Sequence, residues 1–109
     1  MTRTFIMTPV FDRLWNSMDL SDDNLRQLQN RLLINPHEGD IIQGTGGARK
    51  LRNALPNTGK SSGMRIIYFD ITHIGVLLLL LCYPKSKQDD LTNEQKRQVR
   101  AVVEALKGV

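Results

Sequence analysis

A short, uninterrupted apolar run in the second half of the chain constrains the fold most. Residues 76–83 read VLLLLLCY, with Gly75 before them and Pro84 after them. A membrane-spanning helix needs about 20 apolar residues, and even when counted from Ile74 to Tyr83 this run has only about half that length. Its shortness and its flanking breakers favour a strand over a helix, and a strand without polar alternation is buried on both faces. The chain is therefore expected to build a sheet with packing partners on both sides of this strand.

Helical and extended patterns alternate along the rest of the chain. Apolar residues recur at helical spacing after Pro9 and again after Ser21, which can cap a second helix, and Thr92 opens a capping box before a third. We expect strands at residues 4–8, 49–53, 64–72 and 76–83, and helices at 11–18, from Ser21 to Asn35 and from Thr92 to Gly108. The order β-α-α-β-β-β-α predicts an α+β fold: a small antiparallel sheet carrying two N-terminal helices and one C-terminal helix, in one domain over residues 1–109.

The middle of the chain is basic and free of acids. The sequence has 11 acidic residues and a formal net charge of +4, yet no acid lies between residues 41 and 69. Lys50 and Arg52 point the same way from one strand, because side chains repeat every second residue, and Arg65 opens the next strand. Lys85 follows the apolar strand. Cations converging in this way predict an anion site for nucleic-acid phosphate, whereas dispersed cations would be only a solvated basic face.

Other motifs give weaker indications of function. Residues 54–61 (ALPNTGKS) fit a permissive phosphate loop, but a strand pattern follows where that loop needs a helix. Residues 44–47 (GTGG) resemble the Gly-x-x-Gly loop of an RNA-binding module, yet they lead into a strand instead of joining two helices. The adjacent Asp89 and Asp90 are typical of a solvated lead-in to the last helix. The basic residues therefore remain the strongest candidate site.

The cysteine and histidine content bears on disulfide bonds and on metal binding. A single Cys82 allows no internal disulfide, so a reducing cytoplasm is expected. The N-terminal residues have no long apolar region, so no signal peptide is expected. His37 and His73 have no Cys or His at metal-ligand spacing, which predicts no metal site.

Three stretches resemble the RelE/HigB family of bacterial toxins. They are GTGGARKLR at residues 44–52, GKSSGMRIIY at 59–68 and YPKSKQDDLT at 83–92. The expected element order is similar to that fold over essentially the whole chain. The resemblance implies the toxin of a toxin–antitoxin system, an mRNA interferase that cleaves mRNA in the A site of a translating ribosome. It also implies a cognate antitoxin, often a helix-turn-helix protein, with no cofactor and no membrane partner.

The resemblance further implies metal-independent cleavage by attack of the RNA 2′-hydroxyl on the adjacent phosphate. Fixed cations stabilise the negative charge that gathers on the phosphate oxygens. Carried onto this sequence, the catalytic residues are Lys50, Arg52, Arg65 and Lys85, and the RNA-binding residues are Arg49, Lys60 and Lys87.

The sequence also departs from the family pattern. Ser86 stands where the best-studied members carry an arginine, and Thr92 stands roughly where they carry a catalytic tyrosine. The general base is therefore open between Lys50 or Lys85 and, less favourably, Tyr68 or Tyr83. Two alternatives follow: a ParE-like gyrase inhibitor of the same fold, which lacks such a basic cluster, and a catalytically decayed toxin that only binds its antitoxin.

Overall fold

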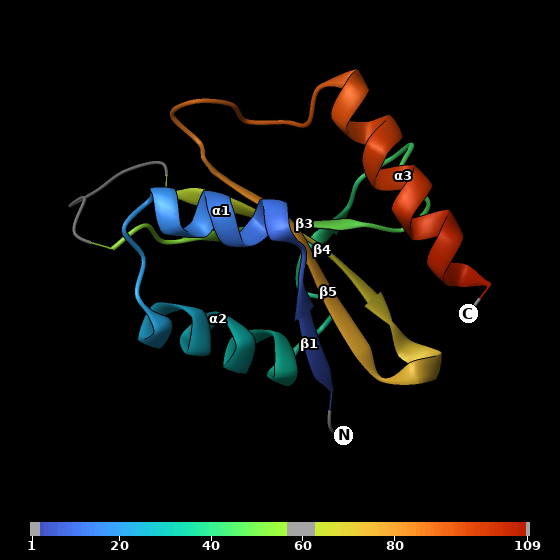
Figure 1. Ribbon diagram of the computed structural model, residues 1–109, viewed down its shortest axis with the longest axis horizontal. Helices are drawn as coiled ribbons and strands as arrows, with labels where there is room; N and C mark the ends of the chain where they lie inside the picture. The colour runs from blue at the N-terminus through green and yellow to red at the C-terminus, as the bar shows by residue number, and fades with distance from the viewer. Residues whose placement is uncertain (1–2, 57–62, 109) are drawn as a thin grey trace.

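The computed structural model describes residues 3–56 and 63–108. The described residues form an α+β fold in which α1 and α2 cover one face of a sheet and α3 covers part of the other (Figure 1). This confirms the expected α+β class and the expected order of elements, to which the structure adds the short strand β2. The elements are β1 (Thr4–Met7), α1 (Pro9–Ser17), α2 (Asp22–Ile34), β2 (Asp40–Ile41), β3 (Arg49–Asn53), β4 (Met64–Ile71), the 3-10 turn η1 (Thr72–Ile74), β5 (Val76–Pro84) and α3 (Asn93–Lys107).

Local sequence determines where each helix begins. Thr8 caps α1, accepting a hydrogen bond from the backbone N–H of Phe11 at 3.0 Å. Ser21 and Asn24 form a reciprocal capping box at α2, and Thr92 with Gln95 forms another at α3. Each box satisfies backbone N–H groups that the first helical turn leaves without partners. The caps predicted at Ser21 and Thr92 are confirmed.

The sheet is mixed, which corrects the expectation of a wholly antiparallel sheet. Its strand order is β1-β5-β4-β3-β2, and β1 pairs parallel to β5 while the other neighbouring strands are antiparallel. The chain crosses over through α1, α2 and the β3–β4 hairpin before β5 returns beside β1, and such a long crossover permits parallel pairing. One additional strand, β2, was not expected, because two residues are too few to show a strand pattern.

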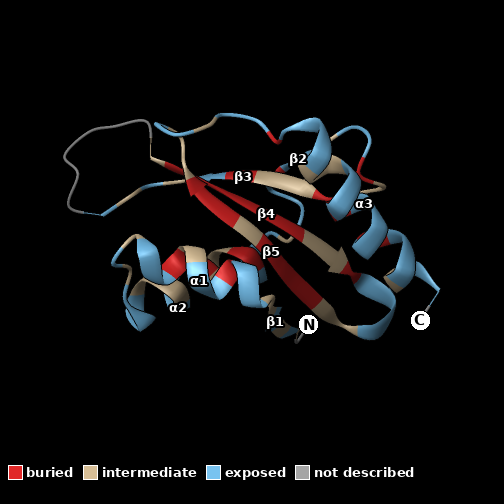
Figure 2. Ribbon diagram, turned by 45° about the horizontal axis from the view of Figure 1, so that its top comes forward, coloured by how far each residue is buried: buried red, intermediate tan, exposed pale blue. Residues whose placement is uncertain are grey.

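The apolar strand β5 lies at the centre of two cores, one on each face of the sheet (Figure 2). Leu77 and Leu79 pack with α1 and α2, whereas Leu78 and Leu80 pack with α3. The ladder with β4 shifts by one residue at a bulge between Ile67 and its neighbour Tyr68, so β5 carries one extra leucine. The prediction of a strand buried on both faces is confirmed.

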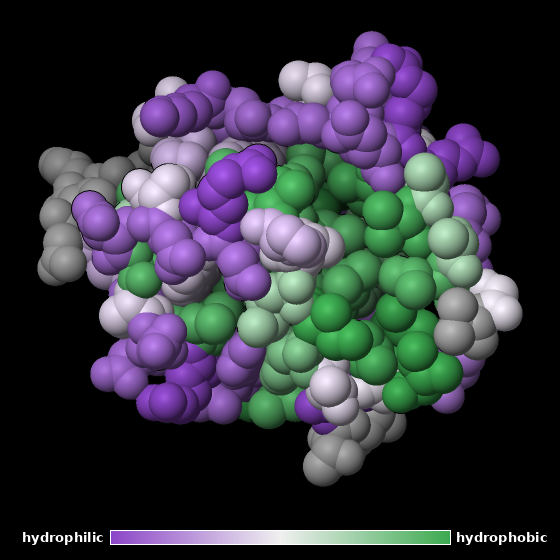
Figure 3. Space-filling model, in the orientation of Figure 1, coloured by the Kyte–Doolittle hydropathy of each residue, from purple (hydrophilic) through white to green (hydrophobic). Residues whose placement is uncertain are grey.

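Part of the α3 side of the sheet remains apolar and open. Figure 3 shows a broad hydrophobic surface beside α3. Exposed apolar side chains on the elements around it include Ile6 of β1, Ile74 of η1 and Val102 of α3. Among the described residues, no helix has both the length and the apolar character needed to cross a bilayer.

Candidate functional site

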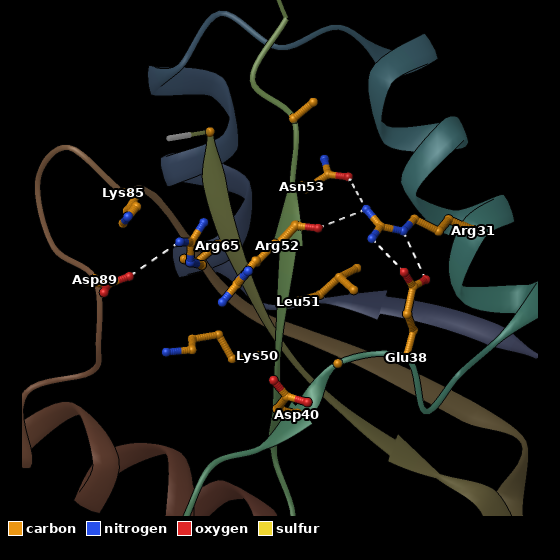
Figure 4. A pocket seen from close by; sticks show the side chains of 13 residues that line it. Arg31, Glu38, Asp40, Lys50, Leu51, Arg52, Asn53, Arg65, Lys85 and Asp89 are labelled. Atoms are coloured by element: carbon orange, nitrogen blue, oxygen red, sulfur yellow. Dashed lines mark hydrogen bonds and ion pairs between the residues drawn. The ribbon is translucent and has the colours of Figure 1, made fainter. Parts of the chain in front are cut away.

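A pocket of about 920 Å³ opens at the edge of the sheet, where β3 continues beyond its pairing with β2 (Figure 4). It contains all four side chains that the sequence predicts as catalytic. Its walls come from the end of α2, the loop into β2, strand β3, the start of β4 and the loop after β5. The lining residues are Arg31, Glu38, Gly39, Asp40, Lys50, Leu51, Arg52, Asn53, Ala54, Gly63, Arg65, Lys85 and Asp89.

Arg52 and Arg65 are direct partners across the β3–β4 ladder. Side chains in such positions leave the sheet about 5 Å apart, and two like charges there destabilise the pair. Lys50 projects from the same face of β3, two residues before Arg52. We call Lys50, Arg52, Arg65 and Lys85 the basic cluster. A strand start would suggest an exposed side chain, but Arg65 is only 5% exposed, so its charge is desolvated as well as crowded.

The end of β5 brings Lys85 and Tyr83 to the same site. The backbone N–H of Lys85 donates to the carbonyl of Gly63 at 3.0 Å, which fixes this turn beside the start of β4. Tyr83 is the ladder partner of Arg65 on the side away from Arg52. Burial raises the pKa of Tyr83 to about 12, so its phenol is neutral at physiological pH and acts as a hydrogen-bond donor.

Two carboxylates approach the basic cluster from the loop between β5 and α3. Asp90 Oδ1 forms an ion pair with Lys50 Nζ, and Asp89 Oδ1 lies 3.4 Å from a guanidinium nitrogen of Arg65. The hydrogen bond from Lys50 lowers the pKa of Asp90. The sequence indicated only a solvated lead-in to α3. Both carboxylates are indeed exposed, but they also contact the cations of the pocket.

The opposite wall of the pocket is an ion pair that the sequence analysis missed. Arg31 of α2 binds Glu38 through two nitrogens, at 3.0 and 2.7 Å, and one of its nitrogens also donates to the carbonyl of Arg52 at 2.9 Å. The hydrogen bond with Glu38 raises the pKa of Arg31, and the same bond lowers the pKa of Glu38. Arg31 thereby ties α2 to the part of β3 that has no β2 partner. No spacing rule links these residues, because the helix end and the loop meet only in the folded chain.

The remaining predicted residues either do not line the pocket or lie outside the described part of the chain. Arg49 points to the other face of β3, where its guanidinium donates to the carbonyl of Gly39 at 2.8 Å. Lys87 is exposed on the loop after β5. Tyr68 is fully buried, and its hydroxyl accepts a hydrogen bond from the Gly39 N–H at 2.9 Å. Lys60 lies outside the described residues.

The donor set of the pocket suits an anion. Within residues 3–56 and 63–108, no group of three His, Cys, Asp or Glu side chains comes together as a metal site would require. The basic cluster instead presents two guanidinium groups and two ammonium groups. Fixed cations in a partly dry site stabilise negative charge that develops on phosphate oxygens. The geometry therefore fits phosphate binding and phosphoryl chemistry.

Comparisons with known proteins support this fold. No known protein-family model matches the sequence. A mutant of the E. coli toxin RelE in the free state matches with a TM-score of 0.53 and 18% sequence identity, over 82% of this chain and 90% of that one. The same RelE mutant in complex with a peptide of the antitoxin RelBc matches with a TM-score of 0.52 and 16% identity, over 85% of this chain and 98% of that one. At such identities the likeness shows a shared RelE fold.

Proposed function

We propose that residues 1–109 form the toxin domain of a toxin–antitoxin pair, acting in the cytoplasm as a metal-independent, ribosome-dependent mRNA endoribonuclease. Its partners would be mRNA in the ribosomal A site and a cognate antitoxin, often a helix-turn-helix protein in this family. The RelE fold supports the toxin assignment, and one solved structure with that fold holds an antitoxin peptide.

One observation carries the catalytic part of the proposal: the pairing of Arg52 with Arg65 across the β3–β4 ladder. Two cations placed opposite each other, one of them buried, weaken the sheet unless an anion lies between them. Such a cost is typical of functional sites, where charges are fixed in advance for a ligand. Lys50 and Lys85 line the same pocket and add to the positive charge.

The proposed chemistry assigns a task to each member of the basic cluster. The RNA 2′-hydroxyl attacks the adjacent phosphorus as its proton passes to solvent water, and the bond from phosphorus to the 5′ oxygen breaks, leaving a cyclic phosphate and a free 5′-hydroxyl. Arg65 and Arg52 would hold the phosphate oxygens as charge develops, since guanidinium groups can bind two oxygens at once. Lys50 would hold the neighbouring phosphate. Lys85 would give a proton to the leaving 5′ oxygen.

A catalytically decayed toxin that only binds its antitoxin is the second candidate, and the tyrosines favour it. Tyr68 and Tyr83 are both buried, and burial raises the pKa of each, so neither phenol is a ready proton acceptor. The third alternative, a ParE-like gyrase inhibitor, gives no role to the basic cluster.

The proposed function is tested by expressing the chain in growing bacteria and mapping mRNA ends by primer extension. The expected result is growth arrest with new 5′ ends inside translated reading frames, and poor cleavage of the same RNA without ribosomes. Arrest without new mRNA ends would favour the gyrase inhibitor. Normal growth with accumulated folded protein would leave the decayed toxin, which capture of the antitoxin would then identify.

A further inference from the structure

Two consecutive carboxylates form ion pairs with cations to which the proposed function assigns phosphate binding. Asp90 pairs with Lys50 and Asp89 with Arg65, and Figure 4 shows the Asp89 carboxylate reaching Arg65 from the loop. The two acidic side chains are 71% and 58% exposed, whereas those of Lys50 and Arg65 are 25% and 6% exposed. The carboxylates therefore cover recessed cations from the solvent side, where an RNA phosphate would also approach.

The backbone of this loop is held in place independently of the two acidic side chains. The Tyr83 hydroxyl donates to the carbonyl of Asp89 at 3.3 Å, and the Gln88 side-chain amide donates to the carbonyl of Asp90 at 3.0 Å. The same amide donates at 2.9 Å to Gln95, which belongs to the capping box of α3. These contacts fix the position of both acids beside the pocket. Each exposed side chain can still leave its cation by changing rotamer, because the backbone anchors do not involve the carboxylates.

We infer that Asp89 and Asp90 are built-in competitors of the RNA backbone, holding the basic cluster partly neutralised until phosphates displace them. The inference rests on the proposed function in one respect: the displacing anion is taken to be RNA phosphate. Exposed ion pairs are weak, so displacing each carboxylate from its cation costs little free energy. An RNA strand with several phosphates displaces both carboxylates more readily than a single phosphate does. The acidic pair thus regulates which anions enter the site.

The test measures binding of a fluorescein-labelled single-stranded 2′-O-methyl RNA by fluorescence anisotropy at about 0.1 M salt, where screening limits effects beyond about 10 Å. This probe lacks the attacking hydroxyl, so binding is read without cleavage. The double variant Asp89→Asn with Asp90→Asn should bind about tenfold more tightly than the wild type, since two competing ion pairs are removed. Circular dichroism confirms the fold, and Asp90→Asn alone gives a milder version of the same test.

Asp22 and Asp23 offer a matched control, because they too are consecutive acids and their change to Asn alters net charge equally. They begin α2, about 12–14 Å along the helix from Arg31 at 1.5 Å per residue, so screening should hold their effect below about twofold. Equal tightening in both double variants would overturn the inference and leave the proposed function standing. In a Lys50→Met background, Asp90→Asn should no longer tighten binding; a retained gain would also overturn it.

These binding measurements, together with cleavage on ribosomes, separate failure of the inference from failure of the proposed function. Tighter RNA binding by the Asp89 and Asp90 variant, with no cleavage on ribosomes by any form, would support the competitor role and remove the nuclease activity. No detectable RNA binding by any form would overturn both.

Discussion

Changing Arg65 to methionine should raise the stability of the fold while removing activity. Arg65 is almost fully buried, directly opposite Arg52, and its approach to Asp89 is long at 3.4 Å. Methionine has similar length and no charge, so it relieves both the like-charge repulsion and the desolvation of the guanidinium. Stability should therefore rise while activity falls, as in proteins whose active-site charges destabilise the fold.

The size of each effect follows from the contacts. The ion pair with the largely exposed Asp89 contributes less than about 1 kcal/mol, and the hydrogen bond from Arg65 to the Met64 carbonyl, at 3.3 Å, contributes about as much. Replacing a buried ion pair by apolar side chains of similar volume is often neutral or gains about 1–4 kcal/mol. The net change in unfolding free energy should be a gain of about 1 kcal/mol, or about 4 °C in Tm. Cleavage should fall by about 10²–10³-fold, the usual cost of losing one fixed donor to the transition state.

Thermal unfolding by circular dichroism and single-turnover cleavage on programmed ribosomes measure the two effects. Arg65→Lys should restore cleavage only in part, because an ammonium keeps the charge without the planar fork. Arg26→Met, on the exposed surface of α2, is the control for loss of one arginine and should change neither quantity appreciably. A loss of more than about 2 kcal/mol in Arg65→Met would show that Arg65 supports the fold. Wild-type cleavage in that variant would remove Arg65 from the mechanism.

Three further predictions concern the surroundings of the basic cluster. Arg31→Met should destabilise the fold by about 1–2 kcal/mol in urea unfolding, because it releases Glu38 and the β3 carbonyl at Arg52, while Arg31→Lys should recover less than half of the loss. Gly39→Ala should weaken the β2–β3 pairing, seen as faster amide exchange there, because the added Cβ would lie 2.8 Å from the backbone oxygen of Lys50. The fold should lose stability as pH rises from about 10 to 12, because burial keeps the Tyr83 phenol protonated in the folded state while an unfolded phenol loses its proton near 10; a flat Tm over this range would contradict that burial.

Local patterns predicted most of the fold because they reflect local physics. The bounds of β3, the helix caps at Ser21 and Thr92 and the double-sided burial of β5 follow from alternation, hydrogen-bonding side chains and an apolar run. The parallel pairing of β1 with β5 was not predictable in this way, because it depends on how distant segments return to one another. The same holds for the contacts of Asp89 and Asp90 with the basic cluster, which a one-dimensional pattern shows only as polar residues before a helix. The alternation rule did place Lys50 and Arg52 on one face, and the ladder adds Arg65 opposite them.

The parallel β1–β5 pair has a consequence for when this protein becomes folded during its synthesis. Thr8, at the end of β1, donates its hydroxyl hydrogen bond to the carbonyl of Leu80, 72 residues later in the chain. At translation rates of about 5–20 residues per second, about 4–14 s pass between the synthesis of β1 and the synthesis of the β5 residues beside it. Contacts so distant in sequence form slowly, since the loop they close must lose its entropy first. The sheet that supports the basic cluster is thus completed late, and the nascent chain carries no assembled site while most of it is being made.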